Sequence, residues 1–254
     1  MRTLMAASWA ILALGLWAAT ADAAEIRLVS AGAVKAIVTE LAESFRQETG
    51  HTVVATFAPV GEVRQRIAAG EPADVVILTD VALEALAASG VVPAAARRDI
   101  AKVGIGVGVR EGAAVPDIST VDAFRQALLA AKSIVYVDPA RGATSGIHFA
   151  GVLQRLGIAD AVKDKTLLWP GGASAEAVAD GRAELCVQQM SEILPVKGVK
   201  LVGPLPREIQ KSTVYSAAPL ARSTASETAR AFIAYLARPA FKAKFAAAGL
   251  DYHE

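Results

Sequence analysis

The segment Gly70-Glu71-Pro72-Ala73-Asp74-Val75-Val76-Ile77 decides the class of fold. Gly70 ends a predicted helix, and the apolar run at 74–78 is short enough to be a strand buried on both faces. Strands of this kind belong to parallel sheets that are covered by helices. The segment therefore predicts an α/β protein.

The elements on either side of this segment alternate. Strands are predicted at 25–30 and 52–57, and helices at 33–49, 61–69 and 81–88. The first helix has apolar residues at helical spacing and is followed by Gly50, a typical helix end. This β-α-β-α-β order predicts a parallel sheet with helices on both faces.

The alternation starts again after a longer strand at 101–109. The later elements are a helix from about Val121 capped by Ser119, helices at 145–156, 159–163, 173–179, 227–237 and 239–248, and strands at 134–137, 167–169, 185–188, 199–202 and 213–217. Two α/β halves joined by crossover strands, at 104–110 and 212–217, predict a two-lobed clamshell. We expect lobe 1 to contain 24–105 plus 215–254, and lobe 2 to contain 106–214.

The first 23 residues have the pattern of a secretory signal peptide. Met1-Arg2 is basic, an apolar stretch runs from about residue 4 to 19, and Ala21-Asp22-Ala23 forms a cleavage site. The apolar stretch is shorter than the ~20 residues that span a membrane. We therefore expect a cleaved signal at 1–23 and a periplasmic protein.

Composition excludes several classes of function. The 26 basic and 25 acidic residues nearly balance, which argues against a nucleic-acid partner. The single cysteine, Cys186, lies in an apolar run and is expected to be a buried hydrophobe rather than a nucleophile. His51, His148 and His253 lack metal-ligand spacing, and no phosphate-binding or dinucleotide motif follows a strand. We expect no metal and no cofactor.

The segment SIVYVDPARGATSGIH, residues 133–148, predicts an anion site. Its pattern predicts a buried strand, then a loop of small residues, and then the start of a helix. At the start of a helix, the backbone N–H groups and the helix dipole favour an anion. The guanidinium of Arg141 suits a carboxylate, although a surface salt bridge is an alternative. Thr144 and Ser145 offer hydroxyls, although they could serve only as helix caps.

Four small-residue loops precede helices, at 30–33, 58–61, 141–146 and 170–174. Ligands of open α/β sheets bind outside the carboxyl ends of the strands, so these loops should face one cleft. The alternative is that small residues only let strands and helices pack closely. The expected ligand-binding residues are Gly32, Ala33, Val60, Gly61, Arg141, Thr144, Ser145, Gly171, Gly172 and Gln189.

The chain after residue 23 resembles the periplasmic molybdate-binding family of ABC importers. The resemblance is carried by LVSAGA (28–33), FAPVG (57–61), GEPADVVI (70–77) and GVKLV (198–202). It implies the type II clamshell fold, in which each lobe is a mostly parallel sheet with helices on both faces. It also implies a small anionic ligand and an ABC permease as partner, and we expect a monomer.

Three positions depart from the pattern of that family. Ala33 and Val60 stand where the resemblance implies serines, and Gln189 stands where it implies a tyrosine. Molybdate sites in this fold are typically built from neutral N–H and O–H donors. The lost hydroxyls, together with Arg141, favour an organic carboxylate as the captured anion. A true molybdate or tungstate binder stays an alternative.

A second resemblance raises the alternative of an enzyme. QQMSE (188–192) and TVYSA (213–217) are similar to a branch of the family that includes periplasmic aconitate isomerase. Such an enzyme shifts a proton across an unsaturated tricarboxylate and needs a base and donors for the developing enolate. If the chain is an isomerase, the candidate bases are Asp138, His148 and Glu192. If it is a binding protein, no catalytic residue is expected.

Overall fold

The computed structural model describes residues 23–252. The predicted signal peptide lies, except for its last residue, outside the described residues. Between residues 23 and 252, no helix is long and apolar enough to cross a membrane.

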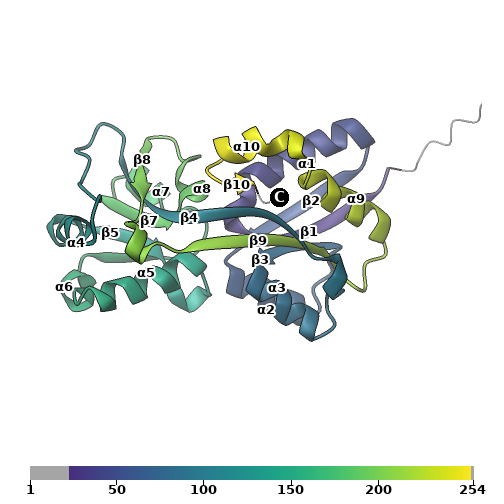
Figure 1. Cartoon of the computed structure of the whole chain (residues 1–254), viewed down its shortest axis with the longest axis horizontal. Coiled ribbons are helices and arrows are strands. Elements are labelled where there is room, and N and C mark those ends of the chain that lie inside the picture. The colour runs from purple at the N-terminus through teal and green to yellow at the C-terminus, as the bar shows by residue number, and fades with distance from the viewer. Residues whose placement is uncertain (1–22, 253–254) are drawn as a thin grey trace, which may run out of the picture.

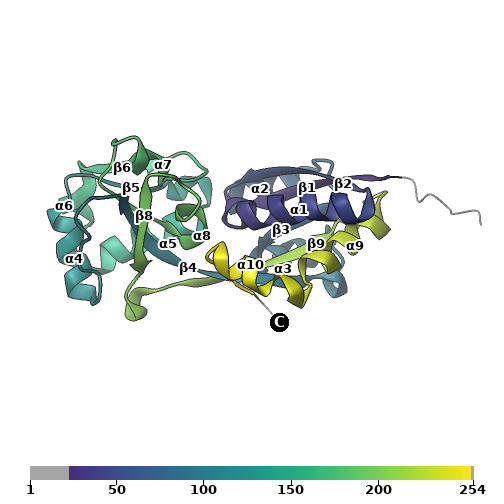
Figure 2. The same ribbon diagram turned by 90° about the horizontal axis from the view of Figure 1, so that it is seen from above.

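Two groups of strands and helices lie side by side, and two long strands run between them (Figure 1). These strands are β4 (Arg98–Arg110) and β9 (Ser212–Pro219), which pair antiparallel with each other. We call the half around β1 and β2 lobe 1 and the half around β5 and β6 lobe 2. The view from above separates the same two halves (Figure 2). The predicted two-lobed α/β clamshell is confirmed.

Lobe 1 is built on three parallel strands. Its strands are β1 (Glu25–Ala31), β2 (Thr52–Ala58) and β3 (Val75–Thr79), in the order β2-β1-β3-β9-β4, with β10 (Asp251–Tyr252) paired to β4. Its helices are α1 (Lys35–Thr49), α2 (Val60–Ala68), α3 (Asp80–Ala88), α9 (Ser226–Leu236) and α10 (Lys242–Ala247). As predicted, α1 ends at Gly50, whose φ of 79° suits glycine.

Lobe 2 repeats the plan. Its strands are β5 (Ile134–Val137), β6 (Thr166–Trp169), β7 (Leu185–Gln189) and β8 (Val199–Pro204). Its helices are α4 (Val121–Ala130), α5 (Thr144–Arg155), α6 (Ala159–Lys163), α7 (Glu176–Ala179) and α8 (Met190–Ile193). Strand β5 is parallel to β6 and β7, and β7 and β8 both pair with β4.

The crossover strands make the sheets mixed, because every antiparallel pair among the described strands includes β4 or β9. Strand β4 pairs with β9 through Gly104 and with β7 from Ile105 onward. At this change of partner the Ile105 N–H donates to Gln210 Oε1 (2.9 Å), and Gln210 Nε2 donates to the Ile105 carbonyl (2.8 Å). The lobe boundaries themselves stay a prediction.

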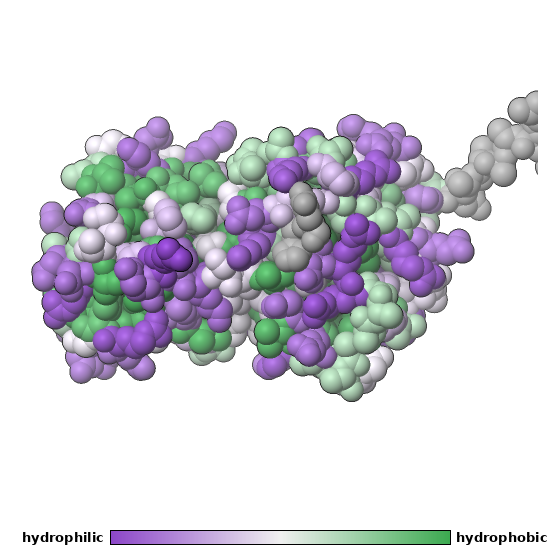
Figure 3. All heavy atoms as spheres, viewed as in Figure 1, coloured by the Kyte–Doolittle hydropathy of each residue, from purple (hydrophilic) through white to green (hydrophobic). Residues whose placement is uncertain are grey.

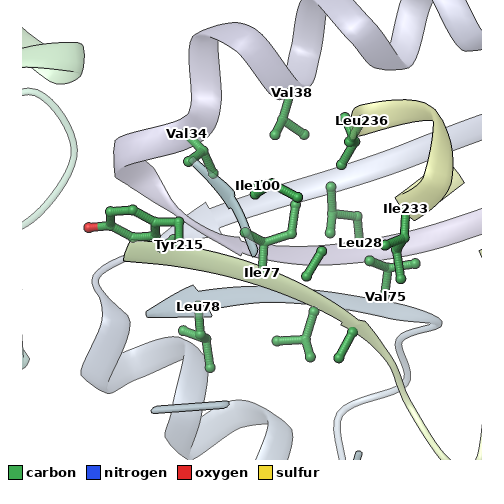
Figure 4. Packing of buried hydrophobic residues seen from close by; sticks show 14 of the residues in the cluster. Leu28, Val34, Val38, Val75, Ile77, Leu78, Ile100, Tyr215, Ile233 and Leu236 are labelled. Carbon is green, nitrogen blue, oxygen red and sulfur yellow. The ribbon is translucent and has the colours of Figure 1, made fainter. Parts of the chain in front are cut away.

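Each lobe has its own apolar core. The larger cluster fills lobe 1 between its sheet and its helices (Figure 4), and two smaller clusters fill lobe 2. Cys186 is buried in lobe 2, and burial raises the pKa of its thiol to about 12, so the thiol is unreactive at neutral pH. On the face drawn in Figure 3, apolar and hydrophilic residues are mixed over both lobes.

Two local predictions were wrong, and one short helix was missed. Helix α7 begins at Glu176 rather than Ala173, because the N–H and hydroxyl of Ser174 both donate to Gln188 Oε1 instead (2.6 Å each). Helix α4 is capped by Thr120, which accepts from the Ala123 N–H at 3.1 Å, rather than by Ser119. The single turn α8 was not predicted at all.

Candidate functional site

A cavity of about 630 Å³ lies between the two lobes. Lobe 1 lines it with the start of α1 and the end of β2, through Gly32, Lys35, Ala36, Thr39, Phe57, Ala58 and Pro59. Lobe 2 lines it with Val137, Ala143, Ser145, Gly172, Ala173, Glu176, Ser191, Glu192, Pro195, Val196 and Lys197. All four loops predicted to face one cleft contribute to this cavity.

The start of α5 is held close to the end of β5. A Cβ atom on Gly146 would lie 2.0 Å from the Val137 carbonyl oxygen, so only glycine lets the helix begin there. This packing places Ser145, which is buried, on the cavity wall. The N–H groups in the first turn of a helix have no acceptor within the helix, so this wall favours an anion.

Buried hydrogen bonds fix the lobe 2 side of the cavity. Gln188 is buried at the end of β7; its Oε1 accepts from Ser174, and its Nε2 donates to the Gly172 carbonyl at 2.8 Å. Ser191 Oγ donates across the interface to the Ala33 carbonyl in lobe 1, at 2.6 Å. The loop at 172–174 and the turn at 190–192 are therefore held in fixed positions.

Glu192 is one of the two acids that line this cavity, together with Glu176. It lies on α8 opposite Gly32, where an added Cβ would come within 2.9 Å of Glu192 Oε1. Burial raises the pKa of its carboxyl to about 8, although a hydrogen bond from Gln188 lowers it. The carboxyl is therefore mostly protonated at neutral pH and can donate a hydrogen bond.

Tyr215 on β9 interacts electrostatically with Glu192. Its hydroxyl points away from the lobe 1 core (Figure 4) and accepts from Gln189 Nε2 at 3.3 Å. Burial and the nearby Glu192 raise the pKa of the phenol, while hydrogen bonds with Gln189 and Thr144 lower it. Within residues 23–252, Gln189 Oε1 is buried without a hydrogen-bond partner. Tyr215 belongs to the TVYSA motif at 213–217, but the sequence predicted no binding or catalytic role for it.

Arg141 lies at the edge of the interface and does not line the cavity. Its guanidinium forms a 2.5 Å salt bridge with Glu62 of lobe 1, and both side chains are partly exposed. Beside this pair, the Gly61 N–H donates to the Gly142 carbonyl at 3.1 Å, and a Cβ on Gly61 would lie 2.7 Å from Gly142 Cα. These contacts join the lobes, and a role for Arg141 in binding the ligand stays a prediction.

The other candidate residues have different surroundings. His148 Nε2 lies 2.7 Å from the Ile209 carbonyl within lobe 2, and burial together with Arg155 and Lys211 lowers its pKa. Asp138 accepts from the Ala140 N–H at 2.9 Å and caps a turn. Of the three candidate bases, only Glu192 lines the cavity. Val60, Gly61 and Thr144 line a neighbouring cavity, Ala33 is buried, and Gly171 packs against Pro59.

No group of three or more His, Cys, Asp or Glu side chains among residues 23–252 is placed to hold a metal ion. Two α/β lobes joined by crossover strands, with a cavity between them, are typical of the class of solute-binding proteins. The chain belongs to the bacterial extracellular solute-binding protein family, whose model matches residues 26–251.

Individual relatives agree with this assignment. An aconitate isomerase from Pseudomonas sp is 37% identical over 218 residues, which cover 84% of this chain and 82% of the relative. The molybdate-binding protein ModA of Azotobacter vinelandii is 29% identical over 236 residues, 89% of each chain. The solved periplasmic molybdate-binding protein of A. vinelandii covers 90% of this chain and 100% of its own, with a TM-score of 0.74 at 22% identity. The predicted family resemblance is confirmed.

Proposed function

We propose that this protein captures a small organic polycarboxylate in the cavity between its lobes, in the bacterial periplasm, and delivers it to an ABC permease. The observation that carries this proposal is Glu192, a largely protonated acid inside a cavity whose other donors suit anions. Membership of the extracellular solute-binding family supports the export, the closure of the lobes and the partner.

The cavity suits a ligand with a carbon skeleton. Its volume of about 630 Å³ is in the range of sites for small organic molecules. Phe57, Val137 and Pro195 supply apolar wall, which a bare tetrahedral oxyanion does not need. The exposed Lys35 and Lys197 lie on the cavity wall, where they attract anions from solution.

Because Glu192 is protonated, its carboxyl is compatible with an anionic ligand beside it. An ionised carboxylate beside the ligand would repel it, whereas a protonated carboxyl donates a charge-assisted hydrogen bond to a ligand oxygen. Residues of both lobes line the cavity, so a ligand inside it can touch both lobes. Binding would therefore favour the closed arrangement.

A proton shift in the bound ligand is the second candidate function. It is favoured by Glu192, whose pKa near 8 suits a general acid–base group, and by the relative named aconitate isomerase. In this step the ionised minor form of Glu192 removes a proton from the carbon beside the double bond. The double bond then moves by one position, and the Glu192 carboxyl, after exchanging its proton with solvent, protonates the carbon at the far end.

Ligand binding tests the first proposal. We expect trans-aconitate or citrate to raise the melting temperature of the mature chain, 24–254, and to change the fluorescence of Trp169, the only tryptophan after the signal peptide. Titration calorimetry with the same ligands gives the affinity. A response to micromolar molybdate but not to any di- or tricarboxylate would contradict the proposal.

Proton exchange tests the second. We expect the protein, incubated with trans-aconitate in D₂O, to place deuterium in the ligand and to form the cis isomer, both followed by NMR. Binding without exchange at high protein concentration would leave the chain a binding protein only.

A further inference from the structure

A second cavity, of about 440 Å³, lies beside β9 on the other side of the α5 start. Thr144 lines this cavity, whereas its neighbour Ser145 lines the first. The other lining residues are Val60, Gly61, Arg64, Thr79, Asp80, Val81, Ala82, Gly142, Ile147, Lys211, Ser212, Thr213 and Val214. Both lobes and one crossover strand thus contribute to it.

Thr213 lines this cavity, and its buried hydroxyl is unpaired. The residue is only 5% exposed, and among residues 23–252 its Oγ1 is one of two buried side-chain atoms without a hydrogen-bond partner. Leaving a buried hydroxyl unpaired costs free energy, and native proteins rarely do so. A ligand atom in the cavity would satisfy it.

The charges around Thr213 indicate the sign of that ligand. Arg64 and Lys211 line the cavity with exposed side chains, and within residues 23–252 neither side chain forms an ion pair or hydrogen bond. The one acid of the lining, Asp80, accepts from the Val81 N–H at 2.8 Å at the start of α3. Two unpaired cations face one engaged carboxylate, so the cavity favours an anion.

We propose that this second cavity is a separate binding site for a small oxyanion. Thr213 Oγ1 donates to one ligand oxygen, Arg64 and Lys211 balance its charge, and the first turns of α2 and α5 line the same cavity. The proposal does not depend on the identity of the ligand in the first cavity.

This position gives the second anion a regulatory effect. Its site exists only when α2 and α3 of lobe 1 face α5 of lobe 2, so the anion binds the closed arrangement. The first cavity is built from the same closed arrangement. The two binding events are therefore linked. The second anion should tighten binding of the first ligand by a certain factor, and the first ligand should tighten binding of the second anion by the same factor.

The test uses sulfate, inorganic phosphate and acetate as probes, each at constant ionic strength made up with chloride. We expect at least one probe to raise the melting temperature of the mature chain saturably. Thr213→Val keeps the shape and removes the hydroxyl, so we expect about tenfold weaker binding of that probe. Thr213→Ser keeps the hydroxyl and should retain binding. Because Thr213→Val removes an unpaired polar group, it should fold at least as well as the parent chain.

Three further variants separate this site from its surroundings. Arg64→Gln and Lys211→Gln should weaken the probe, whereas Lys163→Gln, on an exposed position of α6, should not. Glu192→Gln changes the first cavity, so a probe that responds to this variant and not to Thr213→Val binds in the first cavity instead. The proposal is overturned if no probe gives a saturable response, or if Thr213→Val binds the responding probe as tightly as the parent chain.

Discussion

Two segments of lobe 2 face lobe 1, and they differ in what they bring to the interface. The loop at 138–142 brings a cation, Arg141, which lies at the edge and is paired with Glu62. The turn at 188–192 brings an acid, Glu192, which lies in the cavity and is largely protonated. The first segment therefore joins the lobes, whereas the second faces the cavity between them, which we propose as the ligand site.

The difference teaches that the charge of a residue does not reveal its task in a protein of two lobes. A cation in a helix-start loop looks like an anion ligand until a carboxylate from the other lobe is found beside it. An acid in an anion cavity looks unfavourable until burial shifts its pKa. The contrast between the two segments leads to three predictions.

The largest effect should come from Glu192→Gln on proton exchange, if the chain is an isomerase. Removing the only candidate base that lines the cavity should slow deuterium exchange into trans-aconitate by about 100-fold or more. Calorimetry should still show binding, because the amide also donates a hydrogen bond. Glu176→Gln, an acid on the same cavity wall, is the matched control and should keep its exchange rate. Equal rates for the parent chain and Glu192→Gln would assign the base elsewhere.

The second effect is the pH dependence of affinity. Burial raises the Glu192 pKa to about 8, so the protonated, donating form dominates below that pH and the repelling anion above it. The affinity for citrate should be flat from about pH 6.5 to 7.5 and then fall by up to tenfold per pH unit above about pH 8. Titration calorimetry across this range measures it. A parallel fall in Glu192→Gln would show that another group is responsible.

The smallest effect should come from the salt bridge of Arg141 with Glu62. An exposed pair contributes up to about 1 kcal/mol, so Arg141→Gln and Glu62→Gln should each weaken citrate binding by no more than about fivefold. The double variant should be no weaker than either single variant, and salt should reduce the effect. A much larger loss in Arg141→Gln than in Glu62→Gln would instead make Arg141 a direct ligand of the anion.

Much of the fold could be predicted from the sequence, because local signals define its elements. The helix at 35–49 has apolar residues at helical spacing and a glycine behind it, and the strand at 75–79 is a short apolar run. The turn α8 could not be predicted, since four residues carry no period. Its shape depends on packing against other elements, which include β4, β8 and α1.

The site could be predicted only in outline. The four loops that begin helices were found because small residues after strands are a local signal. The partners of their side chains were not, because Arg141 and Glu62 lie 79 positions apart in the chain. The same limit applies to Tyr215, which interacts with Glu192 and Gln189 only because β9 and β7 both pair with β4.

The backbone contact between Gly61 and Gly142 sets how far the two lobes can approach. Gly142 also has a φ of 71°, and a Cβ on it would lie 2.6 Å from Gly61 Cα, so neither residue can be enlarged without parting the lobes. An alanine at 61 would act as a spacer one methyl group thick. Replacing this residue offers a way to build sensors with graded responses, in which the resting gap is set at a position that does not itself line the first cavity.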